Sequence, residues 1–244
     1  MTRNICYAFI FFLGCSNLFG QQAGQIKYDR TTFYSKIIDE LPYLSEEERD
    51  RQKLTWGKDE GWAHPYILQF SPEKTLYTYG EREREYNFSW KQEEFLLIHD
   101  LQEDHIKHQR VVGGSLFVIE DKRPDYQWKI HNEIREVAGF ICMKAEAIDS
   151  IKNQTIHAWF TTEIPVSSGP EGFAGLPGMI LMLDVNNGTA IIEATEVIMD
   201  EVTFDEPKKI KGKQIAYAEY QEVLQTYMER CIEGERNPYW RLRY

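Results

Sequence analysis

The stretch SSGPEGFAGLPGMILML, residues 167–183, places four glycines and two prolines directly before an apolar run. Glycine reaches backbone conformations that other residues avoid, and proline restricts the unfolded chain, so together they favour a tight and rigid connection. The apolar run that follows is typical of a buried strand. Phe173 and Leu176 are the large apolar side chains of the loop. We expect them to plug the mouth of a sheet or, alternatively, to form a docking surface.

The segments on both sides of this loop also predict strands. Residues 155–166, TIHAWFTTEIPV, alternate apolar and polar side chains and place Glu163 in mid-strand. Residues 179–200 contain two apolar runs around Asn-Asn-Gly, the chemistry of a hairpin turn with positive φ. Alternation recurs at residues 24–34 and 126–148, so most of the chain predicts an antiparallel sheet.

Two segments predict helices instead. Ser45 and Glu48 have the spacing of a capping box before a polar helix. Apolar side chains return to helical spacing from Ile215 to Ile232, which predicts a C-terminal helix at about 213–233 that stops at Gly234. The predicted fold is mainly β, a β-rich α+β domain over residues 21–244. We expect a curved, half-barrel-like antiparallel sheet with the C-terminal helix packed on its concave face or on one edge.

The first 20 residues predict a signal peptide. Arg3 supplies a basic start, and ICYAFIFFLGC is an apolar run that is too short to span a bilayer as a helix. We expect cleavage near Gly20, which would export the protein to the periplasm or to the outer membrane. The stretch FLGCS is a weak match to a lipid-attachment signal, so a lipid anchor at Cys15 is the alternative.

Charge and cysteine content narrow the class of protein further. The formal net charge of −11 argues against nucleic acid as a partner, since phosphate binding needs lysine and arginine. Cys142 and Cys231 remain after removal of the signal peptide. Oxidising conditions favour a disulfide between them, which would pin the helix to a strand, and two buried free thiols are the alternative.

The ionisable residues predict no catalytic centre and no cofactor site. His99, His105 and His108 lie within ten residues, which raises a metal-binding hypothesis, although exposed strand histidines explain them better. Glu163 would need a partner acid or a polarised water to act as a general base, and a solvent-facing strand residue is the favoured interpretation. The glycine-rich loop lacks the lysine of a phosphate-binding loop.

Four stretches resemble one known family in their order and spacing. They are GQIKYDRT at 24–31, CMKAEA at 142–147, HAWFTTEIPVSSGP at 157–170 and GPEGFAGLPGMIL at 169–181. This pattern is similar to the GLPGLI family of exported proteins, which is typical of Bacteroidetes, and Met179 stands where the family name has leucine. The resemblance is strongest over 136–184. It implies a role in the cell envelope near outer-membrane transport proteins, and it implies no established activity.

These observations together predict a non-enzymatic exported protein, a binding or assembly factor for an apolar ligand or for an envelope protein partner. The alternatives are an envelope hydrolase or peptidase with Glu163 or a histidine in the site, and a metal-binding protein that uses the three clustered histidines. The residues expected to contact a ligand or partner are Trp159, Glu163, Phe173, Leu176, Pro177 and Met179.

Overall fold

The computed structural model describes residues 23–81, 94–204 and 206–244 of the chain. The predicted signal peptide and Cys15 lie outside the described residues. Of the helices in the described part of the chain, none is both long and apolar enough to cross a membrane.

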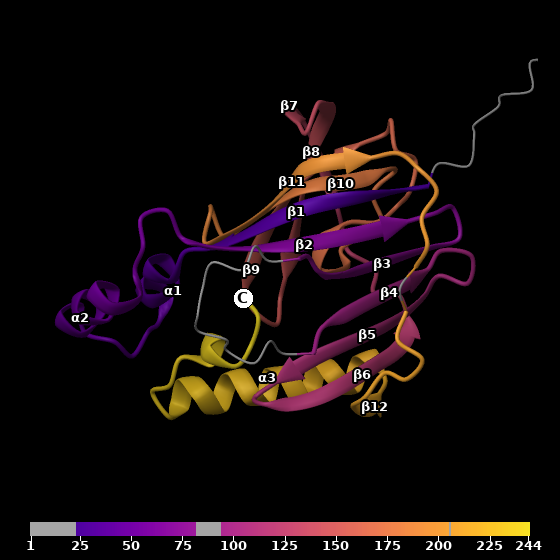
Figure 1. The fold of residues 1–244 in the computed structure, drawn as a ribbon. Helices are drawn as coiled ribbons and strands as arrows, with labels where there is room; N and C mark the ends of the chain where they lie inside the picture. The colour runs from indigo at the N-terminus through magenta and orange to yellow at the C-terminus, as the bar shows by residue number, and fades with distance from the viewer. Residues whose placement is uncertain (1–22, 82–93, 205) are drawn as a thin grey trace, which may run out of the picture.

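Within the described residues, twelve strands form one curved, unclosed sheet (Figure 1). Their order across the sheet is β12-β6-β5-β4-β3-β2-β1-β11-β10-β9-β8-β7, so β12 and β7 are the two edges. The strands are β1 (Gly24–Thr32), β2 (Trp62–Phe70), β3 (Lys74–Tyr79), β4 (Leu96–Asp100), β5 (His105–Val112), β6 (Ser115–Lys122), β7 (Lys129–Val137), β8 (Phe140–Asp149), β9 (Gln154–Thr161), β10 (Met179–Val185), β11 (Ala190–Ile198) and β12 (Lys213–Ile215).

The sheet is mixed, whereas the sequence predicted an antiparallel one. Every neighbouring pair is antiparallel except β12 and β6, which run parallel with Lys213 opposite Phe117. The connection after β11 crosses to the far edge of the sheet and delivers β12 in the same direction as β6. Parallel pairing needs such a crossover, and short local patterns carry no signal for it.

The local turn predictions are confirmed. Asn186, Asn187 and Gly188 all have positive φ angles and join β10 to β11 as a hairpin. Ser45 accepts a hydrogen bond from the backbone N–H of Glu48, whose side chain accepts one in return from Ser45, so the predicted capping box is present.

The structure has helices α1 (Tyr34–Glu40), α2 (Glu46–Trp56) and α3 (Tyr217–Glu233) and the short 3-10 turns η1 (Pro170–Gly172) and η2 (Pro238–Trp240). The predicted C-terminal helix is confirmed as α3, which packs along β5 and β6 (Figure 1). It begins later than expected because residues 213–215 pair with β6. Its buried residues are Tyr220, Leu224 and Cys231, which lie on the predicted apolar stripe.

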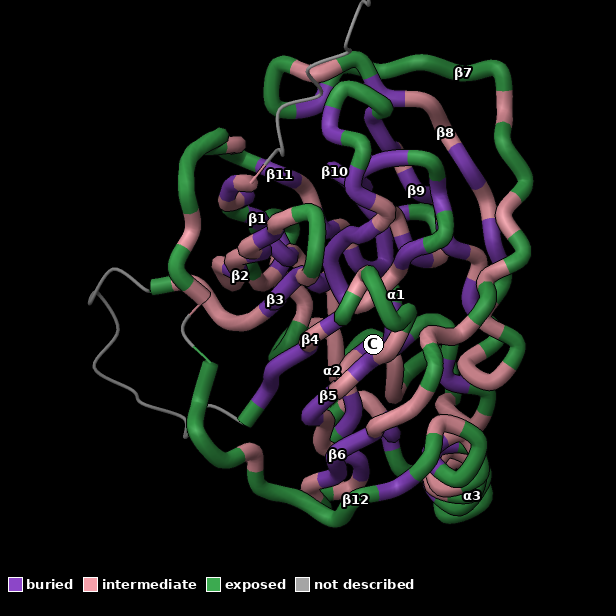
Figure 2. The backbone as a smooth tube through the Cα atoms, turned by 90° about the vertical axis from the view of Figure 1, so that its right-hand side faces the viewer, coloured by how far each residue is buried: buried purple, intermediate pink, exposed green. Residues whose placement is uncertain are grey.

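The last residues of the chain return to the concave side of the sheet. Residues 236–244, called the tail below, follow α3 and end between the sheet and the helix (Figure 1). Leu242 and Tyr244 are each 6% exposed, so these two residues of the tail are part of the core. Figure 2 shows buried backbone along the central strands and an exposed β7 at one edge.

Candidate functional site

The glycine-rich loop between β9 and β10 folds around one buried acid. Glu171 has a left-handed φ of 59° and is 9% exposed, and Gly172 after it has a φ of 80°. A Cβ atom at Gly172 would lie 2.8 Å from Cε1 of His108, so this position needs glycine for space as well as for conformation. The loop therefore delivers a carboxylate into the concave side of the sheet.

Two arginines surround this carboxylate. Arg243 of the tail donates from Nε to Oε2 of Glu171 at 2.6 Å and also contacts Oε1. Nε of Arg30 on β1 lies 3.3 Å from Oε1. Burial by itself would raise the pKa of Glu171, but the positive charges of Arg243 and Arg30 outweigh that effect and lower the pKa to about 2. Glu171 therefore stays ionised, and it serves as an anchor and not as a proton donor.

Arg243 is also held by aromatic rings. Nη1 of Arg243 donates to the hydroxyl of Tyr66 at 2.7 Å. Its guanidinium lies 4.4 Å from the ring centre of Tyr66 and 4.2 Å from that of Phe95. Stacking of this kind adds to the ion pair because guanidinium is attracted to the faces of aromatic rings.

Two further contacts attach the tail to the sheet. Nη2 of Arg30 donates to the backbone oxygen of Tyr244 at 3.0 Å, and Nζ of Lys152 donates to the backbone oxygen of Arg243 at 3.0 Å. Desolvation lowers the pKa of Lys152 to about 8. The loop, β1 and the tail thus form one buried polar cluster.

A cavity of about 470 Å³ lies beside this cluster, between the tail, β2, β3 and the helices α1 and α2. Its volume is that of a small-molecule site. Nearly half of its described lining residues are Phe, Tyr or Trp. The aromatic rings include those of Tyr34, Trp56, Trp62, Tyr79, Phe95 and Trp240.

Positively charged side chains outnumber negatively charged ones in the lining of this cavity. Among the described lining residues, five carry a positive side chain and one carries a carboxylate, although the whole chain has a net charge of −11. The cavity is therefore opposite in charge to the average surface, which favours a ligand with an anionic group. The cations are Arg30, Arg110, Lys152, Arg241 and Arg243, and the acid is Glu94.

Tryptophans form one wall near solvent. The rings of Trp56 and Trp240 are 4.8 Å apart between centres, and Trp240 stacks on Tyr34 at 5.4 Å. Nε1 of Trp62 donates to the backbone oxygen of Trp56 at 3.1 Å. Trp56 is 39% exposed and Trp240 is 43% exposed, so both offer apolar surface to a ligand that approaches from outside.

The loop residues expected to bind a ligand or partner lie in different environments. Leu176 and Met179 are buried in the core, and Pro177 is exposed. Phe173 is half-buried, with its ring centre 4.8 Å from that of Tyr126 and 6.2 Å from that of Trp128. This packing agrees with the expectation that Leu176 and Phe173 plug the sheet.

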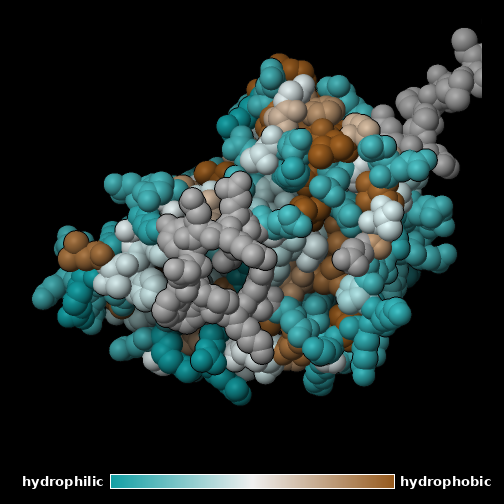
Figure 3. Space-filling view, viewed as in Figure 1, coloured by the Kyte–Doolittle hydropathy of each residue, from teal (hydrophilic) through white to brown (hydrophobic). Residues whose placement is uncertain are grey.

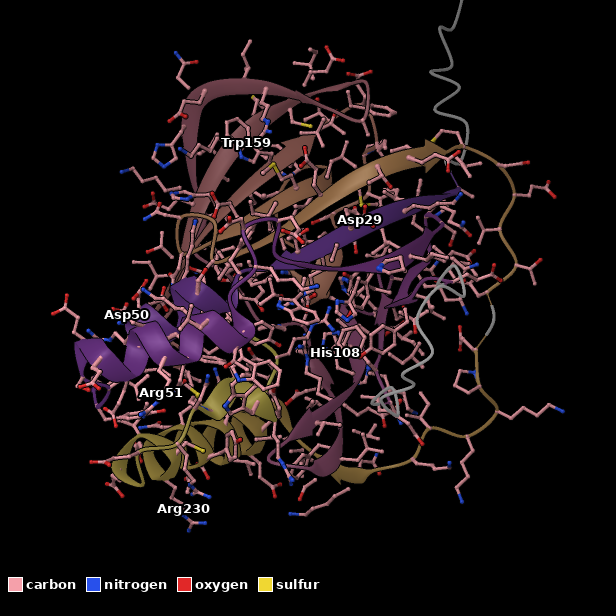
Figure 4. The ribbon with its side chains drawn as sticks, turned by 60° about the vertical axis from the view of Figure 1, so that its left-hand side comes forward. Asp29, Asp50, Arg51, His108, Trp159 and Arg230 are labelled. Atoms are coloured by element: carbon pink, nitrogen blue, oxygen red, sulfur yellow. The ribbon has the colours of Figure 1, made fainter. Side chains whose placement is uncertain are left out.

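Trp159 and Glu163 lie apart from the cavity. Trp159 on β9 packs between Lys144 and Arg135, and Figure 4 places it well away from His108. The prediction that Glu163 lies in mid-strand is wrong. Because β9 ends at Thr161, Glu163 falls in the turn that follows, where its side chain is exposed.

The clustered histidines are more buried than predicted. His99 is 7% exposed and His108 is 5% exposed, because both lie on strands inside the sheet. Nε2 of His99 lies 3.3 Å from Oδ1 of Asp104. Burial, and next the charge of Arg110, hold the pKa of His108 well below its usual value, so this imidazole is neutral. In the part of the chain that the structure describes, no group of three or more His, Cys, Asp or Glu side chains is arranged to hold a metal.

The sequence left two alternatives for the remaining cysteines, a disulfide or two buried free thiols. Cys142 and Cys231 are both free and buried. Cys142 belongs to the main core on β8, whereas Cys231 lies on α3 beside Tyr227 and Tyr43. The two thiols thus occupy separate parts of the fold. Burial raises the pKa of Cys142 to about 12, which keeps it protonated and unreactive.

Sequence reasoning missed the acid and the arginines that organise the site. Glu171 is the one acidic residue in the stretch 167–183, and the tail sequence RLRY is basic and aromatic. A charge held within a rigid glycine-rich loop needs a buried partner, and the basic tail could have been considered as its source.

Comparisons with known proteins agree with this picture of the fold. A family model described as "Protein of unknown function (Porph_ging)" matches residues 148–182, which include β9 and the glycine-rich loop. No curated protein matches the sequence. Two structures of PNGF-II are similar to 83% of this chain, with TM-scores of 0.54 (C2 space group) and 0.53 (P21 space group). Sequence identity to them is 14% and 15%, and the matched part is 32% and 33% of those chains, so this chain spans about a third of their length.

Proposed function

We propose that this protein is an exported binding protein of the cell envelope. Its ligand is amphipathic, with an apolar or aromatic body and an anionic group, and it occupies the cavity beside the tail. The observation that carries this proposal is the combination of an aromatic lining with five cationic side chains in one cavity of about 470 Å³. This refines the apolar ligand expected from the sequence. Arg30 and Arg243 are neutralised by Glu171, but Arg110, Lys152 and Arg241 line the cavity without an ion pair to a carboxylate among the described residues, and they favour a negative charge on the ligand.

The state of the ionisable groups supports binding over hydrolysis. Glu171 is committed to Arg243 and Arg30, and its lowered pKa makes it a poor general acid. The alternative of an envelope hydrolase rests on His64 of β2, which lines the same cavity. Turnover of a substrate that disappears in His64→Ala, with binding retained, would favour the hydrolase.

The cellular location is proposed on separate grounds. The basic and apolar start of the chain is that of a signal peptide. The residues matched by the family model, 148–182, overlap the stretch that resembles the GLPGLI family. The first observation supports export, and the second supports membership in that family. An outer-membrane transport protein or another envelope protein is then the proposed source or recipient of the ligand.

Two fluorescent probes with one scaffold test the binding proposal. 1-Anilinonaphthalene-8-sulfonate is aromatic and anionic, and N-phenyl-1-naphthylamine is its uncharged counterpart. Both should bind saturably, and Trp62→Ala should weaken both by about tenfold, since a stacked aromatic contributes on the order of 1–1.5 kcal/mol. Trp159→Ala is the matched control, because Trp159 is also half-buried but lies outside the cavity.

A second variant tests how much a positive charge in the cavity contributes to binding of the anionic probe. Arg241 is exposed and lines the cavity without taking part in the Glu171 cluster. Arg241→Ala should weaken binding of the sulfonate several-fold and leave the uncharged probe unaffected. Equal loss of both probes would contradict the anionic part of the proposal. Equal binding by wild type, Trp62→Ala and Trp159→Ala would contradict the assignment of the cavity.

A further inference from the structure

The strand β7 is an uncovered edge of the described sheet, and its pairing with β8 is irregular between Ile130 and Ile134 but regular from Ile134 to Val137. It is nine residues long, and all its residues except Val137 and His131 are exposed. Ile134 is 73% exposed and Ile130 is 52% exposed. Edge strands in soluble proteins are usually short, covered or interrupted, because their free N–H and C=O groups pair readily with another strand. An open edge with exposed isoleucines therefore indicates a strand-pairing surface.

The hairpin geometry fixes which backbone groups are free. Ala138 and Gly139 form a two-residue turn between β7 and β8, with Val137 opposite Phe140. Pairs alternate along an antiparallel ladder between those that exchange hydrogen bonds and those that do not. Val137 and Phe140 close the two-residue turn and exchange hydrogen bonds, and so does every second pair before them. The pair of Ile134 and Met143 is three residues before Val137 and therefore does not exchange hydrogen bonds. The backbone N–H and C=O of Ile134 thus point away from β8 and toward the open edge.

The charges of β7 are complementary to those of a second β7. Glu133 lies within 3.2 Å of Lys144, and the guanidinium of Arg135 lies 5.9 Å from the ring centre of Trp159. Both side chains are therefore on the same face, because Lys144 and Trp159 are paired neighbours on β8 and β9. If Ile134 faces Ile134 of a second antiparallel copy, each Glu133 faces the Arg135 of the other copy.

The neighbouring registers are disfavoured by charge. If the twofold axis moves by one residue, Glu133 faces a second Glu133, or Arg135 faces a second Arg135. Like charges directly opposite each other destabilise a sheet, and opposite charges stabilise it. Among these registers, only an axis at Ile134 places opposite charges together.

Exposed apolar surface on the same hairpin supports this pairing. Ile134 is opposite Met143, and Glu136 is opposite Ile141, so the two isoleucines lie on one face. Ile141 is 55% exposed. Figure 3 shows hydrophobic surface gathered at the end of the molecule where β7 and β8 lie in Figure 1.

We propose that β7 pairs with β7 of a second copy of this chain, forming a homodimer with one continuous sheet across a twofold axis at Ile134. An isologous contact of this kind closes on itself and leaves no free β7 edge. The side chains of Glu133 and Arg135 are solvent-exposed in their intrachain ion pairs, so these pairs give little energy that the dimer would have to replace.

Charge exchange tests the register. Sedimentation of the purified protein over a wide concentration range should show a monomer–dimer equilibrium. Glu133→Arg should raise the dimer dissociation constant at least tenfold, and Glu133→Arg with Arg135→Glu should restore it to within about threefold, because the double variant pairs the same charges in reverse. A wild-type protein that stays monomeric would overturn the proposal. So would a folded double variant that fails to recover.

Cross-linking tests the axis without relying on charge. In Ile134→Cys, the two new thiols face each other at the axis, so mild oxidation should give a covalent dimer. Ile148→Cys on β8 is the matched control, since Ile148 is 69% exposed but lies at the other end of the hairpin. Cys142 and Cys231 are buried and do not compete. Equal cross-linking of the two variants, or none in Ile134→Cys, would contradict the proposed axis.

Discussion

Glu171 accepts a hydrogen bond from Arg243, 72 positions later in the chain; the carboxylate is buried and the guanidinium is largely buried against the sheet. This ion pair gives the glycine-rich loop a structural role. The loop holds a carboxylate where the tail can bind it, and the tail in turn forms one wall of the cavity. The conformation of the loop and the shape of the cavity are thus linked through one ion pair.

Removal of the negative charge of Glu171 should lower the free energy of unfolding. Glu171→Gln leaves Arg243 and Arg30 without their carboxylate, and breaking one side of a buried ion pair costs about 3–5 kcal/mol of unfolding free energy. Urea unfolding measures this loss. Glu196→Gln is the control: its exposed pair with Lys27 should contribute less than about 1 kcal/mol. Equal stability of Glu171→Gln and wild type would contradict the anchoring role.

The ion pairs of Glu171 should also make the free energy of unfolding depend on pH in the acid range. The pKa of Glu171 falls from its usual 4.5 to about 2 in the folded protein. The unfolded chain therefore binds a proton at a pH where the native state does not, and acid favours unfolding. This contribution, about 3 kcal/mol from the size of the shift, is complete above pH 4.5 and disappears as pH falls toward 2.

Comparison with a variant isolates this group from the other acids. The difference in unfolding free energy between wild type and Glu171→Gln should shrink between pH 6 and pH 3. A difference that stays constant over this range would show that Glu171 does not titrate as proposed.

Space at Gly172 should matter more than its φ angle. Gly172 and Gly139 have φ angles of 80° and 84°, but a Cβ at Gly172 would meet His108, whereas nothing lies within 4 Å of a Cβ at Gly139. Gly139→Ala should cost about 1 kcal/mol for the left-handed backbone. Gly172→Ala should cost about 1–3 kcal/mol more, because the buried imidazole must move. Thermal or urea unfolding of both variants provides the comparison.

Leu176 should contribute to stability and leave binding unchanged. It is 2% exposed within the core, so Leu176→Ala should lose about 2–5 kcal/mol through lost burial and the cavity left behind. The exposed neighbour Pro177 is the control, and Pro177→Ala should change stability by less than about 1 kcal/mol. Probe affinity at a temperature where both variants are folded should match that of wild type. Lost affinity with unchanged stability would instead make Leu176 a docking residue.

The features that could be predicted from the sequence are those decided by near neighbours. The turn at Asn187 and the capping box at Ser45 follow from contacts between residues a few positions apart. The helix α3 followed from its apolar period. By contrast, the placement of residues 213–215 depends on β6, which is far away in the chain, so helical spacing alone extended the predicted helix too far.

The centre of the site could not be predicted from the sequence because its charged residues come together only in the folded chain. Glu171 looks like a loop residue until Arg30 and Arg243 are brought to it from opposite ends of the chain. His108 looks like an exposed strand histidine until the sheet on either side of β5 and the glycine-rich loop cover it. Aromatic residues such as Trp62 gave no local pattern, because the cavity is formed by several elements at once.

The place of Arg243 in the chain also affects what happens during synthesis and degradation. Proteins are made from the N-terminus, so every strand of the sheet exists before this arginine does. A chain that is cut or released before position 243 retains the acid in the loop without the arginine that donates to its carboxylate. Such shortened copies should open more readily and expose their backbone to proteases, so copies that contain Arg243 would accumulate and copies that lack it would be removed.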